Sequence, residues 1–350
     1  MRFLWKSLKF GYLLVVLLTL LTYVASFVPP VAGTGFMAIG GLCFPYLFIL
    51  HLIVFGWLVL RRSRYAWYAL ATLTLGIPFL LRNVNWHELP SNDRSTLSIS
   101  TFNAQGLTLE QTENLDSAFR LIRHYLGNAD VFALQEINHR FVKDLAVTNE
   151  YPHYIAHPRA STTLMSRHPF TEHGTVRFDS TGNSCLWVDL ATPDGPLRVY
   201  NVHLESNRVS PEIGRLFEEG GDPRRRSTWR RIRNILRDFS FRATRRTEQI
   251  MLLKEHMRGC PHPIVLAGDL NDTPQSYTYR QLKLFLNDGF VQAGRGLAHS
   301  YAGPVPLLRI DYIFASPDLE FTRYRTVRAL NSDHYPVRAD LILKSNASPH

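Results

Sequence analysis

Residues 264 to 271 read Ile-Val-Leu-Ala-Gly-Asp-Leu-Asn, a short apolar run that ends in polar side chains. A run of this length and composition predicts a buried β-strand. Asp269 and Asn271 come where the strand should end. They share one face if the extended conformation continues that far, because side chains two apart on a strand point the same way. The stretch therefore predicts a sheet with a carboxylate and an amide at one strand end.

The same pattern of short β-type runs continues on both sides of this stretch. Together with 264 to 267, the expected strands are 97 to 102, 131 to 134, 163 to 165, 185 to 190, 197 to 203, 310 to 315 and 337 to 341. Helical segments and polar loops lie between them. This alternation predicts a mixed α/β or α+β domain.

Several of these runs end in polar or titratable side chains. Asn103, Glu136 and His203 each close a strand, and Asn201 lies on the same face as His203. The segments Arg309-Ile-Asp311 and Ser332-Asp333-His334 complete the series.

Taken alone, each of these residues has an ordinary structural interpretation. An Asn or Asp after a strand most often forms a turn, and Glu136 would be a solvated carboxylate. His203 would be a core histidine, and Asp333-His334 a surface pair. Independent turn residues need not, however, supply together a carboxylate for a hard metal ion, an Asp/Asn pair and an Asp/His pair. Their joint occurrence favours one chemical site.

Seven motifs follow one another in order along residues 97 to 341. They are Phe102-Asn103, Leu134-Gln135-Glu136, Met165-Ser166-Arg167, Asn201-Val-His203, Gly268-Asp269-Leu-Asn271, Arg309-Ile-Asp311-Tyr312 and Ser332-Asp333-His334-Tyr-Pro336. In this order they resemble the endonuclease/exonuclease/phosphatase superfamily, which includes pancreatic deoxyribonuclease. The resemblance implies an α+β fold, a four-layer α/β/β/α sandwich with two sheets face to face and helices outside. The motif Gly-Asp-Leu-Asn-Asp-Thr-Pro, together with the apolar N-terminal segment, is similar to a bacterial membrane-anchored branch of that superfamily.

The resemblance also implies a metal site. Glu136 is the expected first ligand of Mg²⁺, or of Mn²⁺, with Asn103 and Asp333 beside the ion. Mg²⁺ takes oxygen ligands and is commonly held by one or two carboxylates plus the substrate phosphate.

The remaining motif residues receive catalytic roles from the same resemblance. Asp269 would orient or deprotonate the attacking water, while Asn271 and His203 would donate hydrogen bonds to phosphate oxygens. Asp311 would orient His334, which would bind the phosphate or act as acid or base.

The first 82 residues have a different composition from the rest of the chain. They hold seven Lys/Arg and no Asp/Glu, so most of the net charge of +10 belongs to them. From 10 to 60 there is no charged residue, a stretch too long for one crossing and interrupted by proline and glycine between 29 and 35. We expect a transmembrane segment, 1–90, with two to three helices at about 10–28, 36–60 and 65–81, followed by a catalytic domain, 91–350. A cleaved signal peptide is the alternative for the first run.

Charge also predicts the orientation of this segment. The N-terminal tail and the loop 61–64 each carry three basic residues, whereas the loop 29–35 carries none. Both basic segments should face the cytoplasm, which puts the catalytic domain on the non-cytoplasmic side of a bacterial inner membrane. If the third run does not cross, the domain lies in the cytoplasm instead.

An arginine-rich segment occupies residues 208 to 246, with twelve Arg against five acidic residues. Residues 228–239 predict a basic amphipathic helix. It would pack on the sheet, bind anionic lipid, or follow a nucleic-acid backbone. A separate helix is expected at 245–257, with Ile250, Leu253 and Met257 in the core. The three cysteines lack zinc-site spacing and are expected to be buried thiols.

The sequence thus predicts a membrane-anchored, Mg²⁺-dependent phosphoester hydrolase, with a phosphodiesterase or nuclease as first expectation. The alternatives are a lipid-headgroup phosphodiesterase or phosphatase, and a non-catalytic, membrane-tethered interaction module. The expected partners are a phosphoester substrate and membrane lipid, and no protein partner is indicated. Substrate choice in such a fold depends on loops, so the motifs do not distinguish nucleic acid from phospholipid.

Overall fold

The computed structural model describes residues 2–88, 97–104, 124, 127, 129–156, 162–178, 183–207, 224–328 and 332–344. The expected domain boundary near residue 90 and the first part of the arginine-rich segment, 208–223, lie outside these residues. Side chains are described from Phe10 onward, so the basic side chains of the N-terminal tail lie outside as well. The chain forms two compact units, and each is described by itself.

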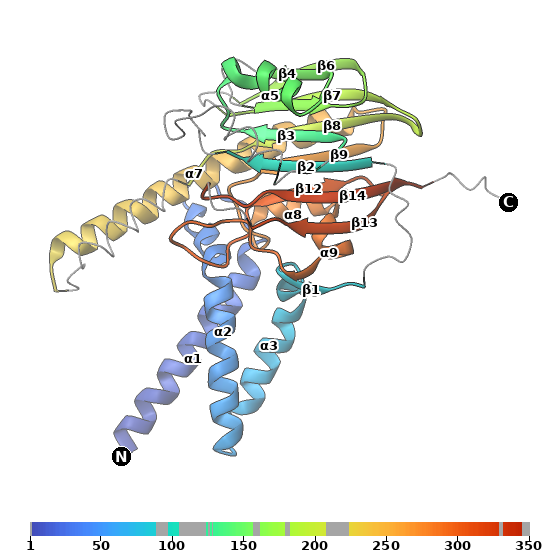
Figure 1. Ribbon diagram of the computed structural model, residues 1–350. Coiled ribbons are helices and arrows are strands. Elements are labelled where there is room, and N and C mark those ends of the chain that lie inside the picture. The colour runs from blue at the N-terminus through green and yellow to red at the C-terminus, as the bar shows by residue number, and fades with distance from the viewer. Residues whose placement is uncertain are drawn as a thin grey trace. The chain divides into compact units, whose positions relative to one another are not determined.

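Two six-stranded sheets form the framework of one unit (Figure 1). The first has the order β13-β14-β2-β3-β5-β4, with bounds Leu319–Thr326, Val337–Leu343, Leu97–Asn103, Val131–Gln135, Thr162–Ser166 and His153–Ala156. The second has the order β10-β12-β9-β8-β7-β6, with bounds Asn287–Asp288, Asp311–Ala315, Ile264–Asp269, Gly195–His203, Ser184–Thr192 and Phe170–Arg177. A separate two-stranded sheet pairs β1, Val84–Trp86, with β11, Arg295–Leu297.

The main core lies between the two large sheets. Ile99, Val131 and Leu164 of the first sheet meet Val199 and Val265 of the second there, all without exposed surface. Strands covered on both faces are apolar throughout, which is why the sequence showed continuous apolar runs rather than alternation.

Helices cover the outer faces of both sheets. On the first sheet, α5, Val142–Thr148, buries Leu145 against Phe132 of β3. On the second, His256 near the end of α7, Arg226–Arg258, packs on Trp187 of β7 and hydrogen-bonds Tyr200 of β8. The short helices η2, His139–Phe141, α8, Tyr277–Lys283, and α9, Gly289–Ala293, complete the described elements of the sandwich. The predicted four-layer α+β sandwich is confirmed.

All eight predicted strands are present; besides β1 and β11, the sequence analysis did not identify the four edge strands of the large sheets. These are β13, β4, β10 and β6. An edge strand is half exposed and carries polar side chains, so its sequence lacks the apolar run of a central strand. β6, for example, reads Phe-Thr-Glu-His-Gly-Thr-Val-Arg.

Helix α7 corrects one prediction. The expected helices at 228–239 and 245–257 are a single helix of 33 residues. The residues between them contain no proline or glycine, and Ala243 continues the buried face from Phe239. Because nothing in this linking stretch interrupts the backbone hydrogen bonds, the helix runs through.

The other unit contains a bundle of three apolar helices, α1, Arg2–Ala25, α2, Ile39–Leu60, and α3, Ala66–Leu80. A single 3₁₀ turn, η1, Gly35–Ala38, precedes α2. Tyr23 of α1 stacks on Phe79 of α3 at 5.0 Å between ring centroids, and its hydroxyl donates to the carbonyl of Thr72. The three helices lie side by side in Figure 1. Residues 207–247 and 272–280 belong to the same unit.

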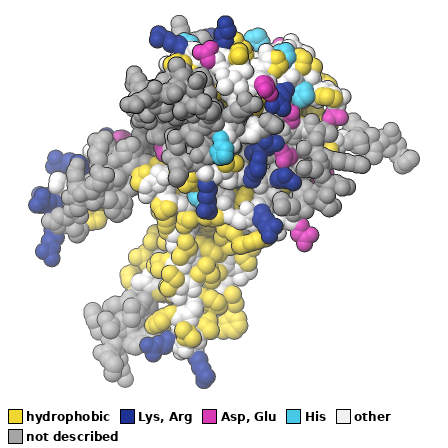
Figure 2. All heavy atoms as spheres, in the orientation of Figure 1, with side chains coloured by type: hydrophobic (Ala, Val, Ile, Leu, Met, Phe, Trp, Pro, Cys, Tyr) yellow, Lys and Arg dark blue, Asp and Glu magenta, His cyan; other side chains and the backbone are white. Residues whose placement is uncertain are grey.

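Hydrophobic side chains cover the outside of this bundle (Figure 2). Leu17, Ile53 and Leu75, one from each helix, are 54%, 65% and 59% exposed. Among the described residues, Gly35–Leu60 is the one helix long and apolar enough to cross a membrane, whereas Phe10–Ala25 and Ala66–Leu80 are shorter apolar helices. Signal sequences and buried core helices share this length and composition, but only 22% of the apolar window in Gly35–Leu60 is buried.

Candidate active site

Strand pairing brings the predicted site residues to one end of the sandwich. β2 runs parallel to β3, which pairs Asn103 with Gln135 and puts Glu136 directly after the strand. β8 runs parallel to β9, which pairs His203 with Asp269. β12 runs antiparallel to β9, so its first residue, Asp311, lies opposite Asp269. Parallel strands share their carboxyl ends, so four segments distant in sequence converge there.

The backbone at these strand ends adopts unusual conformations. Gly268 has φ +143°, and a Cβ atom there would collide with the carbonyl of Val202, so only glycine fits. Glu136 and Asn271 have φ of +54° and +51°. The extended conformation therefore ends at Asp269 rather than continuing to Asn271. Non-glycine residues in this left-handed region cluster at functional sites.

Asn271 nevertheless lies against Asp269, through a turn rather than through strand alternation. Its backbone N–H donates to Asp269 Oδ1 at 2.7 Å, and its side-chain Nδ2 donates to Asp269 Oδ2 at 3.1 Å. Both carboxylate oxygens of Asp269 are thus oriented by a single residue.

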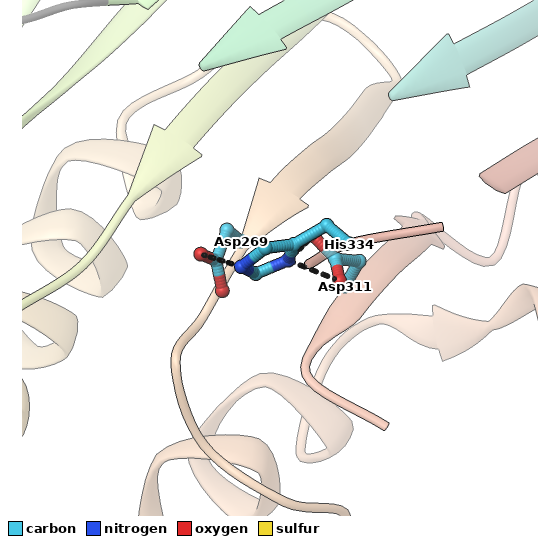
Figure 3. A group of neighbouring side chains, drawn as sticks. All are labelled: Asp269, Asp311 and His334. Atoms are coloured by element: carbon cyan, nitrogen blue, oxygen red, sulfur yellow. Dashed lines mark hydrogen bonds and ion pairs between the residues drawn. The ribbon is translucent and has the colours of Figure 1, made fainter. Parts of the chain in front are cut away.

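His334 lies between two carboxylates (Figure 3). Its Nδ1 is 2.9 Å from Asp311 Oδ2, and its Nε2 is 3.8 Å from Asp269 Oδ2. The ring of Tyr301 packs edge-on against the imidazole, with 5.8 Å between centroids. Because Asp311 is a carboxylate, we assign the Nδ1 proton to the bond with Asp311, and Nε2 faces Asp269.

Burial and charge shift the pKa values of this group. Burial alone lowers the pKa of His334, but the carboxylates of Asp311 and Asp269 outweigh it and raise that pKa to about 10. Desolvation raises the pKa of Asp269 to about 7, against the opposing effect of His334. A carboxylate that titrates near neutrality beside an imidazolium is an arrangement typical of acid–base sites.

Asn103, Glu136 and His203 line the neighbouring side of Asp269. The amide Nδ2 of Asn103 donates to Asp269 Oδ2 at 3.0 Å and to Glu136 Oε1 at 3.1 Å. His203 Nε2 lies 3.5 Å from Glu136 Oε1, is buried, and has no hydrogen-bond partner among the described residues. Burial lowers the pKa of His203, which keeps the imidazole neutral. A buried ring nitrogen without a hydrogen-bond partner indicates a position where a further polar group can bind.

Asp333 joins the group through the turn that carries His334. Ser332 Oγ donates to the carbonyl of Asn103 at 2.9 Å and accepts from the N–H of His334. Asp333 Oδ1 lies 3.7 Å from His334 Nε2, and burial raises the pKa of the Asp333 carboxyl. The structure therefore brings all eight predicted site residues into one cluster.

The donor set of this cluster fits a divalent cation. Asp269, Asp311 and His334 each offer a ligand atom within 4.8 Å of the others, all three buried. Since Asp311 is bonded to His334, and both oxygens of Asp269 are bonded to Asn271, the neighbouring carboxylates of Glu136 and Asp333 are the more suitable donors. Oxygen ligands are those that hard cations prefer.

Gln135 and Asn201, which the resemblance placed in motifs without a role, connect the two sheets beneath the site. Gln135 Nε2 donates to Asn201 Oδ1 at 2.6 Å, and Asn201 Nδ2 donates to the carbonyls of Leu134 and Thr163. Both side chains are fully buried. Asn201 therefore holds the sheets in register and does not line the site with His203.

The start of β12 is fixed by Ser300, which the sequence analysis did not identify, and by Arg309 of the Arg309-Ile-Asp311-Tyr312 motif. Ser300 Oγ accepts from the N–H groups of Ile310 and Asp311 at 3.0 and 2.9 Å. Arg309 is fully buried and makes a two-pronged ion pair with Asp288, at 2.8 and 2.5 Å. No local sequence signal indicates either contact, because each partner is ten or more residues away.

Arg309→Met is expected to destabilise the protein by about 3–5 kcal/mol, because it leaves the Asp288 carboxylate buried without its partner. Chemical denaturation of the full-length protein measures this. Arg309→Met combined with Asp288→Asn should recover part of the loss, since Asn retains the cap on Phe290 N–H without the charge. Equal stability of the single variant and the wild type would contradict a structural role for the pair.

Comparisons with known proteins agree with this geometry. A sequence model described as the endonuclease/exonuclease/phosphatase family matches residues 100–334, so the chain belongs to that family. Residues 5–83 match a model described as a domain of unknown function (DUF8431). No match was found among curated proteins.

Solved structures of the same family share the fold. An endonuclease/exonuclease/phosphatase family protein from Bacteroides thetaiotaomicron has 18% identity and a TM-score of 0.51, with 73% of this chain and 97% of that chain covered. The mannosyl-6-phosphatase Bt3783 from the same organism has 19% identity and a TM-score of 0.50, covering 71% and 100%. D. rerio TDP2 complexed with a single-strand DNA product has 20% identity and a TM-score of 0.52, covering 70% and 98%. The protein thus has the hydrolase fold of this family.

Proposed function

We propose that the protein is a membrane-anchored, Mg²⁺-dependent phosphoester hydrolase, with phosphodiesterase or nuclease activity as the first expectation. One observation carries the proposal: His334 is held between Asp311 and Asp269, and Asp269 is joined through Asn103 to Glu136. Phosphoester hydrolysis requires an oriented water, donors for the phosphoryl oxygens and a group that can carry a proton. This cluster supplies all three.

Asp269 is the group proposed to orient the attacking water and accept its proton, which its raised pKa favours near neutral pH. His203 Nε2, buried without a hydrogen-bond partner among the described residues, donates to a phosphoryl oxygen. Asn271 Nδ2 does the same after leaving Asp269 and the carbonyl of Leu204. His334, kept as an imidazolium by Asp311, hydrogen-bonds the phosphate or protonates the leaving oxygen.

Glu136 is the proposed first ligand of Mg²⁺ or Mn²⁺, with Asn103 and Asp333 beside the ion. When bound, the cation neutralises charge on the phosphoryl oxygens. The cation does not take over the acid–base role of His334, because Asp311 and His334 are already hydrogen-bonded to each other.

Removing divalent cations from the full-length protein in detergent should abolish turnover, and added Mg²⁺ should restore it. Glu136→Gln is expected to raise the Mg²⁺ concentration for half-maximal activity by at least about 10- to 100-fold, the loss typical of an outer-shell partner, because Glu136 is the proposed direct ligand. Glu172→Gln, at a side chain 69% exposed on an edge strand, is the matched control. Full activity in the presence of a strong chelator would rule out the metal-dependent proposal.

The apolar bundle is the proposed membrane anchor. Its outward hydrophobic side chains, Leu17, Ile53 and Leu75 among them, find a partner in the acyl region of a bilayer. Within the proposal, residues 1–90 form the transmembrane segment and 91–350 the catalytic domain. The charge distribution of the loops favours a catalytic domain on the non-cytoplasmic side of a bacterial inner membrane.

The N-terminal half of α7 is proposed to lie on anionic lipid. Arg226, Arg230, Arg233 and Arg237 are exposed and spaced so that they share one side of the helix. Trp229, 59% exposed, lies at the edge of that side. In the same unit, Phe239 and Ala243 pack on Ala38, which fastens this half of the helix to the end of the bundle beside the uncharged loop 29–35.

Amide hydrogen exchange of residues 226–240 tests this contact. Full-length protein in anionic nanodiscs should show stronger protection there than in zwitterionic ones, because each arginine near an anionic surface contributes about 1 kcal/mol. Replacing Arg230, Arg233 and Arg237 by glutamine should remove the difference. Equal protection in both lipids would exclude anionic lipid as a partner of α7.

A lipid-headgroup phosphodiesterase or phosphatase is the second candidate, favoured by α7 and by the anchor. The related folds act on substrates as different as those named for Bt3783 and TDP2, so the fold alone does not choose. The deciding experiment offers purified protein and Mg²⁺ a panel of DNA, RNA, phospholipids and small phosphoesters, with an Asp269 variant as blank. Turnover of no substrate would favour the non-catalytic, membrane-tethered alternative.

A further inference from the structure

The segment 272–280 follows the catalytic motif in the chain but packs with the apolar N-terminal helices, an association that no sequence pattern predicted. It follows Asn271 directly in the chain, yet it belongs to the same compact unit as the apolar helices. Gln275 Nε2 donates to the carbonyl of Phe79 at the end of α3, and the Gln275 side chain is buried. Arg82 Nη1 donates to the carbonyl of Pro274 at 2.8 Å. The end of α3 thus holds the middle of the segment by hydrogen bonds.

Helix α2 approaches the same segment more closely than a side chain would allow. A Cβ atom at Gly41 would lie 2.7 Å from Thr273 Oγ1 and 3.5 Å from the carbonyl of Gln275. Thr273 Oγ1 is buried and has no hydrogen-bond partner among the described residues. The hydroxyl therefore serves as a packing contact against α2, at a position where a Cβ atom on Gly41 would displace it.

Both ends of the segment are also fastened within this unit. Asp272 accepts from Arg246 Nε at 3.2 Å, with side chains 6% and 0% exposed. Arg280 lies over the ring of Phe27, next to the end of α1, with its guanidinium carbon 4.5 Å from the centroid. All three apolar helices therefore contact residues 272–280 or border them.

We propose that α1–α3 act as a positioning element for the hydrolytic site, by fixing residues 272–280 and through them Asn271. This inference rests on the proposed function. Asn271 has a positive φ, and its backbone N–H orients Asp269 Oδ1, so the geometry at Asp269 depends on where the following peptide is held. A displacement of the segment by a few tenths of an ångström is transmitted through one peptide bond, and misplacement of a reacting group by about 1 Å can cost 10²-fold in rate.

Gly41→Ala in the full-length protein tests the proposal. We expect kcat for a small phosphodiester, bis(p-nitrophenyl) phosphate, to fall about tenfold, with KM and the melting temperature nearly unchanged. Gly56→Ala is the matched control, because it adds the same methyl group to the same helix with nothing within 4 Å. Thr273 Oγ1 has no hydrogen-bond partner among the described residues, so Thr273→Ala removes the colliding hydroxyl without breaking a hydrogen bond. The double variant Gly41→Ala/Thr273→Ala should therefore regain most of the lost kcat.

Amide hydrogen exchange of residues 268–280 gives a readout that does not depend on turnover. Exchange there should increase in Gly41→Ala, remain at the wild-type level in Gly56→Ala, and return toward it in the double variant. If the wild type hydrolyses no substrate, the proposed function fails while the exchange pattern still reports on positioning. Equal kcat and equal exchange in the two glycine variants would overturn the inference, as would a loss in Gly41→Ala that Thr273→Ala does not restore.

Discussion

Asp269→Asn is expected to lower kcat by about 10²- to 10⁴-fold, the range for loss of a general base, while the protein stays folded. Asparagine keeps the size of the side chain. Its single amide oxygen can accept either from Asn103 and Asn271 Nδ2, as Oδ2 does, or from the Asn271 N–H, as Oδ1 does. It cannot accept a proton from water. Steady-state kinetics with the substrate found in the panel, together with a melting curve, measure both parts of the expectation.

The pH dependence of the wild type provides a second check on Asp269. Its pKa is raised to about 7, and the ionised form is the active base, so kcat/KM should fall as pH drops below about 7. A cation beside the carboxylates favours their ionised forms, so a higher Mg²⁺ concentration should move this acid limb to lower pH. Activity of Asp269→Asn within tenfold of the wild type would remove Asp269 from the proposed chemistry.

His334→Gln is expected to lower kcat about 10²- to 10³-fold, because it removes the cation that faces Asp269 and the proton it carries. In the wild type the pKa of His334 is raised to about 10, so the imidazolium persists through neutral pH and activity should decline only above about pH 10. The glutamine variant should lack this alkaline limb.

Asp311→Asn is the more informative partner variant. It retains a hydrogen-bond acceptor for Nδ1 but removes the neighbouring negative charge, which lowers the pKa of His334. The alkaline limb should therefore move to lower pH, whereas a purely structural role for Asp311 would lower activity equally at all pH values. A profile with an unshifted alkaline limb would contradict the orientation of His334 by Asp311.

Edge and central strands differed in how well the sequence predicted them. The central strands carry uninterrupted apolar runs, such as Val131–Gln135, because both their faces are covered. The edge strand β6 is mostly polar and partly exposed, so its sequence does not stand out from that of a loop. Helix α7 contains the apolar residue Phe241 on its exposed side, 60% accessible, which interrupts the amphipathic pattern although no residue there breaks a helix.

The site shows the same division between local and distant information. Asn103, Glu136, His203 and Asp269 were identifiable because each ends an apolar strand, a feature visible in a few consecutive residues. The order of the motifs indicated the family, and the family implied the four-layer fold. Ser300, which holds the start of β12, carries no such local mark.

What the sequence determined by itself is therefore the set of strands with two covered faces, the polar residues at their ends and the apolar helices, since each follows from neighbouring residues. Only the tertiary structure decided that Asn201 bridges the sheets and that Gly41 must leave room for Thr273. The physical reason is that both roles depend on contacts between residues more than 30 positions apart in the chain. Hydrophobic periodicity predicts that a face is buried, but it does not predict which other residues cover that face.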